Sequence, residues 1–267
     1  MTPRRPRLSN RLRQAALAAL LVMGTSRMAY GQGTIVVSFE IPPDLTVQVG
    51  GPFYFDATVQ NASTDTVRLK FGHHGKWNYE FALVNPDGTT TAIPPYRQIG
   101  PGPKGTIVVE ANQTRTRRVI FNEWHNFAAP GEYVLKLRLT VLLSSSANVS
   151  WQKEFFEDLR VNVAPYNPAS LKETCARLAD VAAGPAEGDA AADASLALSY
   201  VSDPVAVPFL AKVLREGTAA ARPGAVRGLT RVGTREAQEA LRSRLPSADP
   251  ELKARIESAL TQFPPGS

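Results

Sequence analysis

Apolar and polar residues alternate, or form short β-branched runs, from about residue 33 to residue 165. Proline, glycine, asparagine and aspartate separate these runs, as is typical of turns between strands. No helical stretch in this half is long enough for a crossover between parallel strands. The pattern therefore predicts about seven to nine short strands in an antiparallel β-sandwich. The expected strands span residues 34–41, 45–49, 53–60, 66–71, 79–84, 105–109, 116–121, 132–141 and 149–163, the last with an interruption.

The segment 132–139 has the clearest alternation in this half. Tyrosine and leucine occupy its odd positions, and mostly charged residues occupy its even positions. One face should therefore be buried and the other exposed to solvent. The strand begins after Pro130 and Gly131, and Tyr133 is placed to hydrogen-bond back across the corner, as in a tyrosine corner.

Residues 53–61 and 67–71 resemble the B and C strands of an immunoglobulin-like domain, and residues 129–139 resemble the entry into a late strand of that fold. The cysteine pair of antibody domains is absent, because Cys175 is the only cysteine. The resemblance is thus to bacterial immunoglobulin-like or fibronectin-like modules and covers about half of the chain. Such modules bind other macromolecules, which implies a binding role.

After residue 167 the apolar residues take on the spacing of amphipathic helices. Asp203-Pro204 and Asp249-Pro250 each place a capping residue before a proline at the first helical position. The expected helices span residues 168–183, 189–201, 204–215, 219–232, 234–244 and 250–262. The change of pattern predicts a boundary between a β-sandwich domain at 32–165 and a helical domain at 166–267.

Apolar positions in these helices recur with an offset of 31 residues. The aligned sets are Leu198, Leu229 and Leu260; Ala194, Ala225 and Ile256; and Val201, Val232 and Phe263. Such a period is typical of an α-solenoid, and residues 203–214 with 225–229 resemble a HEAT-type repeat. The alternative is a helical bundle whose leucines coincide by chance. In a solenoid, the first helix pair should pack against the β-domain as a cap.

The N-terminus has the features of an export signal. Residues 1–13 are rich in arginine, residues 15–23 are apolar, and Ala29-Tyr30-Gly31 forms a small-x-small triplet. These features predict a bacterial secretory signal peptide at residues 1–31, and therefore a periplasmic or secreted protein. The alternative is an uncleaved anchor. After cleavage we expect no stable membrane span, because no stretch reaches the roughly 18 apolar residues that one needs.

The basic charge of the chain lies in this N-terminal segment. The full sequence has 30 Lys and Arg against 24 Asp and Glu, and residues 1–31 hold six of the arginines and no acidic residue. Removal of the segment leaves 24 residues of each sign. Because nucleic-acid binding relies on surplus positive charge, we expect no nucleic-acid partner.

Catalytic motifs are missing from the sequence. It contains no Gly-x-Ser-x-Gly, His-Glu-x-x-His, Cys-x-x-Cys or phosphate-binding glycine-rich loop. The three histidines are His73, His74 and His125. A zinc site that uses all three, or two of them with a carboxylate, would make the protein a metal-dependent hydrolase. We instead expect no enzymatic activity, no metal and no cofactor.

Candidate binding residues in the β-half are aromatic. Trp77, Tyr79, Trp124 and His125 lie near the ends of predicted strands, where loops of sandwiches bind partners, and aromatic rings are enriched at interaction hot spots. Trp151 is expected to fill the sandwich core instead.

Candidate binding residues in the helical half are arginines. Arg227 and Arg231 lie on the second helix of a predicted pair, and solenoids bind partners through the face formed by such helices. The sequence thus favours a non-catalytic exported protein that binds an unidentified protein partner through sandwich loops and the helical-repeat face. The alternative is a carbohydrate- or peptide-recognising, inhibitor-like β-sandwich module, and a third reading is the hydrolase.

Overall fold

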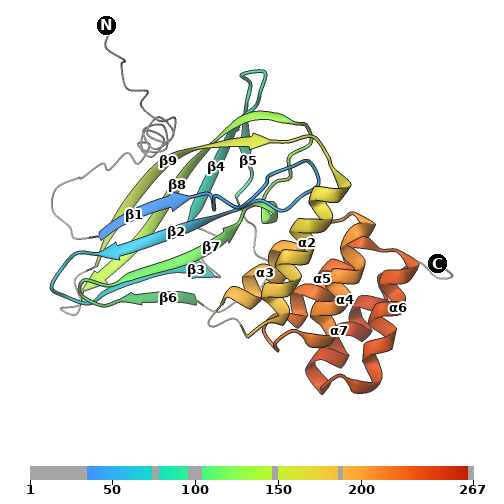
Figure 1. Ribbon diagram of the computed structural model, residues 1–267. Helices are drawn as coiled ribbons and strands as arrows, with labels where there is room; N and C mark the ends of the chain where they lie inside the picture. The colour runs from blue at the N-terminus through green and yellow to red at the C-terminus, as the bar shows by residue number, and fades with distance from the viewer. Residues whose placement is uncertain (1–34, 74–77, 96–103, 146–149, 186–188, 264–267) are drawn as a thin grey trace, which may run out of the picture. The chain divides into compact units, whose positions relative to one another are not determined.

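The computed structural model describes residues 35–73, 78–95, 104–145, 150–185 and 189–263. Thr34–Ser267 form one compact unit, in which the strands come first and the helices follow (Figure 1). The expected signal peptide lies outside the described residues, as do Trp77 and His74.

The described strands form two antiparallel sheets. The smaller sheet has the order β1 (Ile35–Glu40), β2 (Tyr54–Asn61) and β7 (Thr114–Ile120). The larger has the order β5 (Thr90–Ile93), β4 (Tyr79–Val84), β8 (Gly131–Ser145), β3 (Val67–His73) and β6 (Lys104–Val109), and β9 (Ser150–Val163) pairs with β8. The short η1 helix (Phe121–Glu123) follows β7.

Aromatic side chains join the two sheets into a sandwich-like core. The ring of Phe55 on β2 contacts Tyr79 and Phe81 on β4, with centroids 6.4 and 6.3 Å apart. On β8 the odd positions from Tyr133 to Leu139 are buried, which confirms the predicted alternation. The hydroxyl of Tyr133 donates a hydrogen bond to the Ala129 carbonyl at 2.9 Å, which confirms the predicted corner.

The structure corrects the strand prediction at three places. Residues 45–49 form a single bridge, at Gln48, instead of a strand. Strand β5 was not predicted, because its threonines are exposed and show no alternation. The interruption expected near 149–163 is wrong: β9 is continuous from Ser150 to Val163 because it pairs with β8 along this whole length. The prediction that Trp151 fills the core is also wrong, because it is 37% exposed at one end of β9 and does not belong to the core cluster.

Six α-helices follow the sheets in the described part of the chain. They are α2 (Pro168–Ala183), α3 (Ala190–Leu198), α4 (Val207–Glu216), α5 (Arg222–Val232), α6 (Arg235–Arg244) and α7 (Pro250–Leu260), with short 3-10 helices η2 (Pro204–Ala206) and η3 (Leu245–Ser247). The side chains of Asp203 and Asp249 accept hydrogen bonds from the backbone N–H groups of Val205 and Leu252. Both predicted caps are therefore confirmed.

The helices pack in two rows. Helix α4 contacts α2 and α6, and helix α5 contacts α3 and α7. The residues that recur every 31 positions are buried or partly buried in the core. Helix α5 approaches its neighbours closely, because a Cβ at Gly228 would lie 2.5 Å from Leu210 Cδ2 and 3.0 Å from Ser199 Cα. Glycine at this position is what permits this packing.

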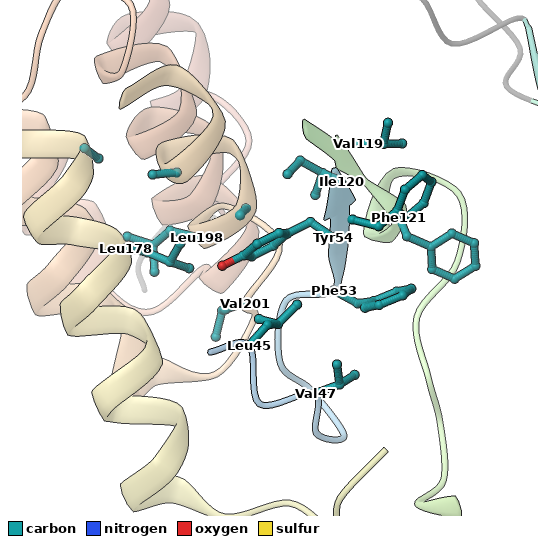
Figure 2. Close-up of a cluster of buried hydrophobic side chains, with 14 of the residues drawn as sticks. Leu45, Val47, Phe53, Tyr54, Val119, Ile120, Phe121, Leu178, Leu198 and Val201 are labelled. Atoms are coloured by element: carbon teal, nitrogen blue, oxygen red, sulfur yellow. The ribbon is translucent and has the colours of Figure 1, made fainter. Parts of the chain in front are cut away.

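The first two α-helices contact the β-half. The Asn167 backbone N–H, just before α2, donates to Gln48 Oε1 at 3.0 Å, and Arg177 on α2 forms an ion pair with Asp44. Figure 2 shows Tyr54 of β2 extending toward Leu178 and Leu198, which lie on α2 and α3. An apolar interface therefore supports the polar contacts.

Candidate functional site

The aromatic candidates of the β-half are used for packing. Tyr79 is only 4% exposed, and its ring contacts those of Phe55, Phe81 and Trp124. Burial accordingly raises the pKa of Tyr79 well above its usual value. Trp124 is partly buried against the same core and lies 5.1 Å from the ring of Phe81. Tyr79 is therefore a core residue, and Trp124 covers one end of that core.

His125 also packs against aromatic rings. Its imidazole lies 6.2 Å from the ring of Phe121 and 6.5 Å from that of Phe127, and burial lowers its pKa. Within the described ranges, no group of three or more His, Cys, Asp or Glu side chains is placed to hold a metal ion.

The arginine candidates lie in an open groove of about 770 Å³ between α5 and α7. On the α5 side the lining residues are Pro223, Val226, Arg227, Thr230 and Arg231. On the α7 side they are Glu251, Ala254, Arg255, Ser258 and Ala259, with Gln262 just beyond the helix. Both arginines predicted from the sequence therefore line one wall of one groove.

Arg231 is held in place by residues that follow α3. Its guanidinium lies over the ring of Tyr200, 4.1 Å from the centroid, and its Nη1 donates to the Ser199 carbonyl at 2.7 Å. A cation over an aromatic face gains about 0.5–1 kcal/mol at an exposed site. The guanidinium of Arg231 is therefore held against the end of α3, at the edge of the groove.

Arg227 is exposed, and among the described residues its guanidinium makes no hydrogen bond or ion pair. On the opposite wall, Arg255 is paired with Glu251 one helical turn away, at 2.9 Å. Both partners of that pair are largely exposed, so the pair contributes only about 0.3–0.5 kcal/mol. A carboxylate of a ligand could therefore replace Glu251 as the partner of Arg255 with little loss of free energy.

A smaller cavity of about 60 Å³ continues the groove toward the start of α5 and shares Pro223, Glu251 and Arg255 with it. It adds Arg222, whose buried Nε has no hydrogen-bond partner among the described residues. It also adds Asp249, so the lining of this smaller cavity holds two arginines and two carboxylates and is balanced in charge.

The groove is related to the 31-residue repeat. Tyr200, Arg231 and Gln262 are spaced by that offset, and so are Arg227 and Ser258. Equivalent positions of successive helices thus lie next to one another, and two of them form the cation–aromatic contact. Tyr200 was not predicted as a site residue, although its offset of 31 residues from Arg231 was a usable signal.

The sandwich end and the groove edge are neighbours at one point. Glu123 of η1 lies close enough to Tyr200 to contribute to raising its pKa, after the larger effect of burial, while Arg227 and Arg231 lower it. Trp124 and His125 directly follow Glu123 in the chain. The structure therefore brings the segment that carries these two candidates near Arg231, even though their rings serve the core.

No helix in the described part of the chain is both long enough and apolar enough to cross a membrane.

Comparisons with known proteins give only distant similarities. No protein-family model matches the sequence, and no curated protein matches it significantly. The ASH/PapD-like domain of human CEP192 is 11% identical, with 54% of this chain and 99% of that domain covered and a TM-score of 0.31. The CARDB domain of the PF1109 protein from Pyrococcus furiosus, in complex with di-metal ions, is 12% identical, with 52% and 95% covered and a TM-score of 0.26.

The alkylpurine DNA glycosylase AlkC of Pseudomonas fluorescens, bound to DNA with an abasic site analogue, is 11% identical, with 46% of this chain and 30% of that chain covered and a TM-score of 0.23. TM-scores this low carry no argument about function. The chain's own strands and helices place it in a β + α class, with antiparallel sandwich-like sheets followed by six α-helices in the described residues.

Proposed function

We propose that this is a non-catalytic, exported bacterial protein that binds another protein through the groove between α5 and α7 and the adjoining end of the sandwich. The observation that carries the proposal is the convergence of Arg227 and Arg231, with Arg255 opposite, on one open groove of about 770 Å³. Arginine and tyrosine are enriched at protein interfaces and at their hot spots. Tyr200 supplies the aromatic member of such a cluster.

We infer that the strands form an immunoglobulin-like module. Two opposed antiparallel sheets and the hydrogen bond from Tyr133 to Ala129 support this assignment. We likewise infer that the helices form a short HEAT-type stack. The two rows α2–α4–α6 and α3–α5–α7, and the buried positions that repeat every 31 residues, support this inference. In such a stack the groove between α5 and α7 lies between equivalent helices of neighbouring repeats.

Photocrosslinking in the living source cells tests this function. A photoreactive amino acid at Gln262, which is exposed and lines the groove, should give a reproducible adduct with one protein of the envelope or of the secreted fraction. The same amino acid at Arg242, which is exposed on α6 and does not line the groove, is the matched control and should give none.

The adduct should disappear when Arg227→Glu is combined with the crosslinker at Gln262. Equal adducts from both crosslinker positions, or an adduct that survives Arg227→Glu, would show that the groove is not the binding surface. Recovery of the protein only in the cytoplasmic fraction would overturn the exported part of the proposal.

A further inference from the structure

The charge of the groove is strongly one-sided. Among the described residues that line it, Glu251 is the one carboxylate, and it stands against Arg227, Arg231 and Arg255. The residues from 166 to 267 carry 12 Lys and Arg and 12 Asp and Glu, so this surplus is local. Because Arg255 is already paired with Glu251, the remaining positive charge of the lining lies on the α5 wall, and Glu123 lies beyond its edge, near Tyr200.

The two arginines of that wall are spaced to match an extended chain. Arg227 and Arg231 are four residues apart on α5, which places them about 6 Å apart along the helix axis. In an extended peptide, side chains on one face recur every second residue, about 6.6–6.8 Å apart. Two carboxylates at alternate positions of a strand would therefore have nearly the same spacing as the backbone positions of Arg227 and Arg231.

The remaining lining suits a peptide backbone. Val226, Ala254 and Ala259 are small apolar residues that let a main chain approach closely. Ser258 and Gln262 provide polar groups on the opposite wall for its N–H and C=O groups. The groove thus offers positive charge to two acidic side chains of a peptide and polar groups to the peptide backbone between them.

We propose that the groove binds an extended acidic segment of a partner protein, in which two carboxylates separated by one residue contact Arg227 and Arg231. This inference rests on the proposed function and adds the chemistry of the partner. Arg231 is pre-positioned by Tyr200 and Ser199, so little side-chain entropy is lost when it binds. Arg227 has no described partner to give up, and a guanidinium binds a carboxylate through two parallel hydrogen bonds.

A nucleic acid fits these observations less well. Its affinity comes from many phosphate contacts along a positive surface, whereas this groove offers a few arginines on a chain with balanced charge outside residues 1–31. A single-stranded oligonucleotide is therefore the competing probe in the test.

The test measures fluorescence anisotropy of labelled ten-residue peptides with the purified protein. The main probe carries two aspartates separated by one alanine in an otherwise serine and alanine sequence. The matched probes replace both aspartates with asparagine, or separate them by four residues. We expect the main probe to bind at least tenfold more tightly than either, with affinity that falls as salt is raised.

Protein variants locate the site. Arg227→Glu, at an exposed position, should weaken binding of the main probe at least tenfold, and Arg242→Glu on α6 should change it less than twofold. Equal binding of the asparagine probe, insensitivity to Arg227→Glu, or tighter binding of the oligonucleotide would overturn the proposal.

The outcomes separate this proposal from the one it rests on. A groove-dependent adduct from Gln262 without binding of the acidic probe would keep the protein-binding function and reject its acidic ligand. Absence of both the groove-dependent adduct and the binding of the acidic probe would reject both proposals.

Discussion

The sandwich and the helices use their most distinctive side chains in opposite ways. In the sandwich, Tyr79 and Trp124 are taken up by an aromatic core that joins the two sheets. In the helices, leucine and alanine fill the interior, and Arg227 and Arg231 remain at an open groove. Residues of the types found at binding sites are thus free to contact a partner only where other side chains fill the core.

The two regions satisfy their buried polar groups in the same way, by hydrogen bonds between segments that are separate in the sequence. Asn61 is fully buried in the sandwich, and its amide donates to the carbonyls of Asp65 and Val109 at 2.8 and 2.9 Å. Asn122 is buried as well and accepts a hydrogen bond from the Phe53 backbone at 2.5 Å. The contacts of Asn61 with Val109 and of Asn122 with Phe53 join segments that are far apart in sequence. In the helices, the buried hydroxyl of Ser195 likewise donates to the Ala221 carbonyl at 2.6 Å.

The largest effect should come from the aromatic core. Tyr79→Ala removes a buried ring and should lower the free energy of unfolding by about 3–5 kcal/mol, because the cavity left among Phe55, Phe81 and Trp124 closes only in part. Denaturant unfolding followed by tryptophan fluorescence measures this loss.

Two variants sharpen that result. Tyr79→Phe keeps the ring and should cost less than about 1.5 kcal/mol. Tyr200→Ala, at the edge of the groove, should cost less than Tyr79→Ala because its ring is only partly buried. A loss below about 1 kcal/mol for Tyr79→Ala would place its ring on a binding surface after all.

An intermediate effect is expected where the two regions face one another. Asp193 on α3 has a pKa raised to about 6, first by burial and then by Asp189, and Asp56 adds to the shift, while Arg117 and Arg118 on β7 oppose it. The folded state therefore binds this proton more tightly than the unfolded state, whose pKa is near 3.8. The associated stability is fully present below about pH 4 and is lost as the pH rises through about 6.

Asp193→Asn should remove this dependence. We expect the variant to match the wild type near pH 4 and to be more stable by about 1–2 kcal/mol at pH 7.5, as measured by urea unfolding across the pH range. Glu257→Gln, on the exposed face of α7, controls for the loss of one acidic group. Equal stability of Asp193→Asn and wild type at pH 7.5 would mean that Asp193 is well solvated.

Local signals explain what the sequence could predict. Asn167, Asp203 and Asp249 accept hydrogen bonds from N–H groups within three residues, and helix α2 has the bounds that its pattern predicted. Strand β5 was missed because its place depends on pairing with β4, and β9 is continuous because of β8. Arg227 and Arg231 were predicted as candidates because they lie on a repeating helical face. The burial of Tyr79 could not be predicted in this way, because it depends on a contact with Phe55 on the other sheet.

The smallest predicted effect tests whether the contact between Tyr200 and Arg231 holds this arginine in place at the groove. A double-mutant cycle with Tyr200→Leu and Arg231→Gln should give a coupling of about 0.5–1 kcal/mol, because the guanidinium lies over the ring. The cycle of Tyr200→Leu with Arg235→Gln should give none, since Arg235 is exposed and paired with Glu239. Zero coupling between Tyr200 and Arg231 would leave Arg231 an ordinary surface residue, and the acidic probe would then depend on Arg227 alone.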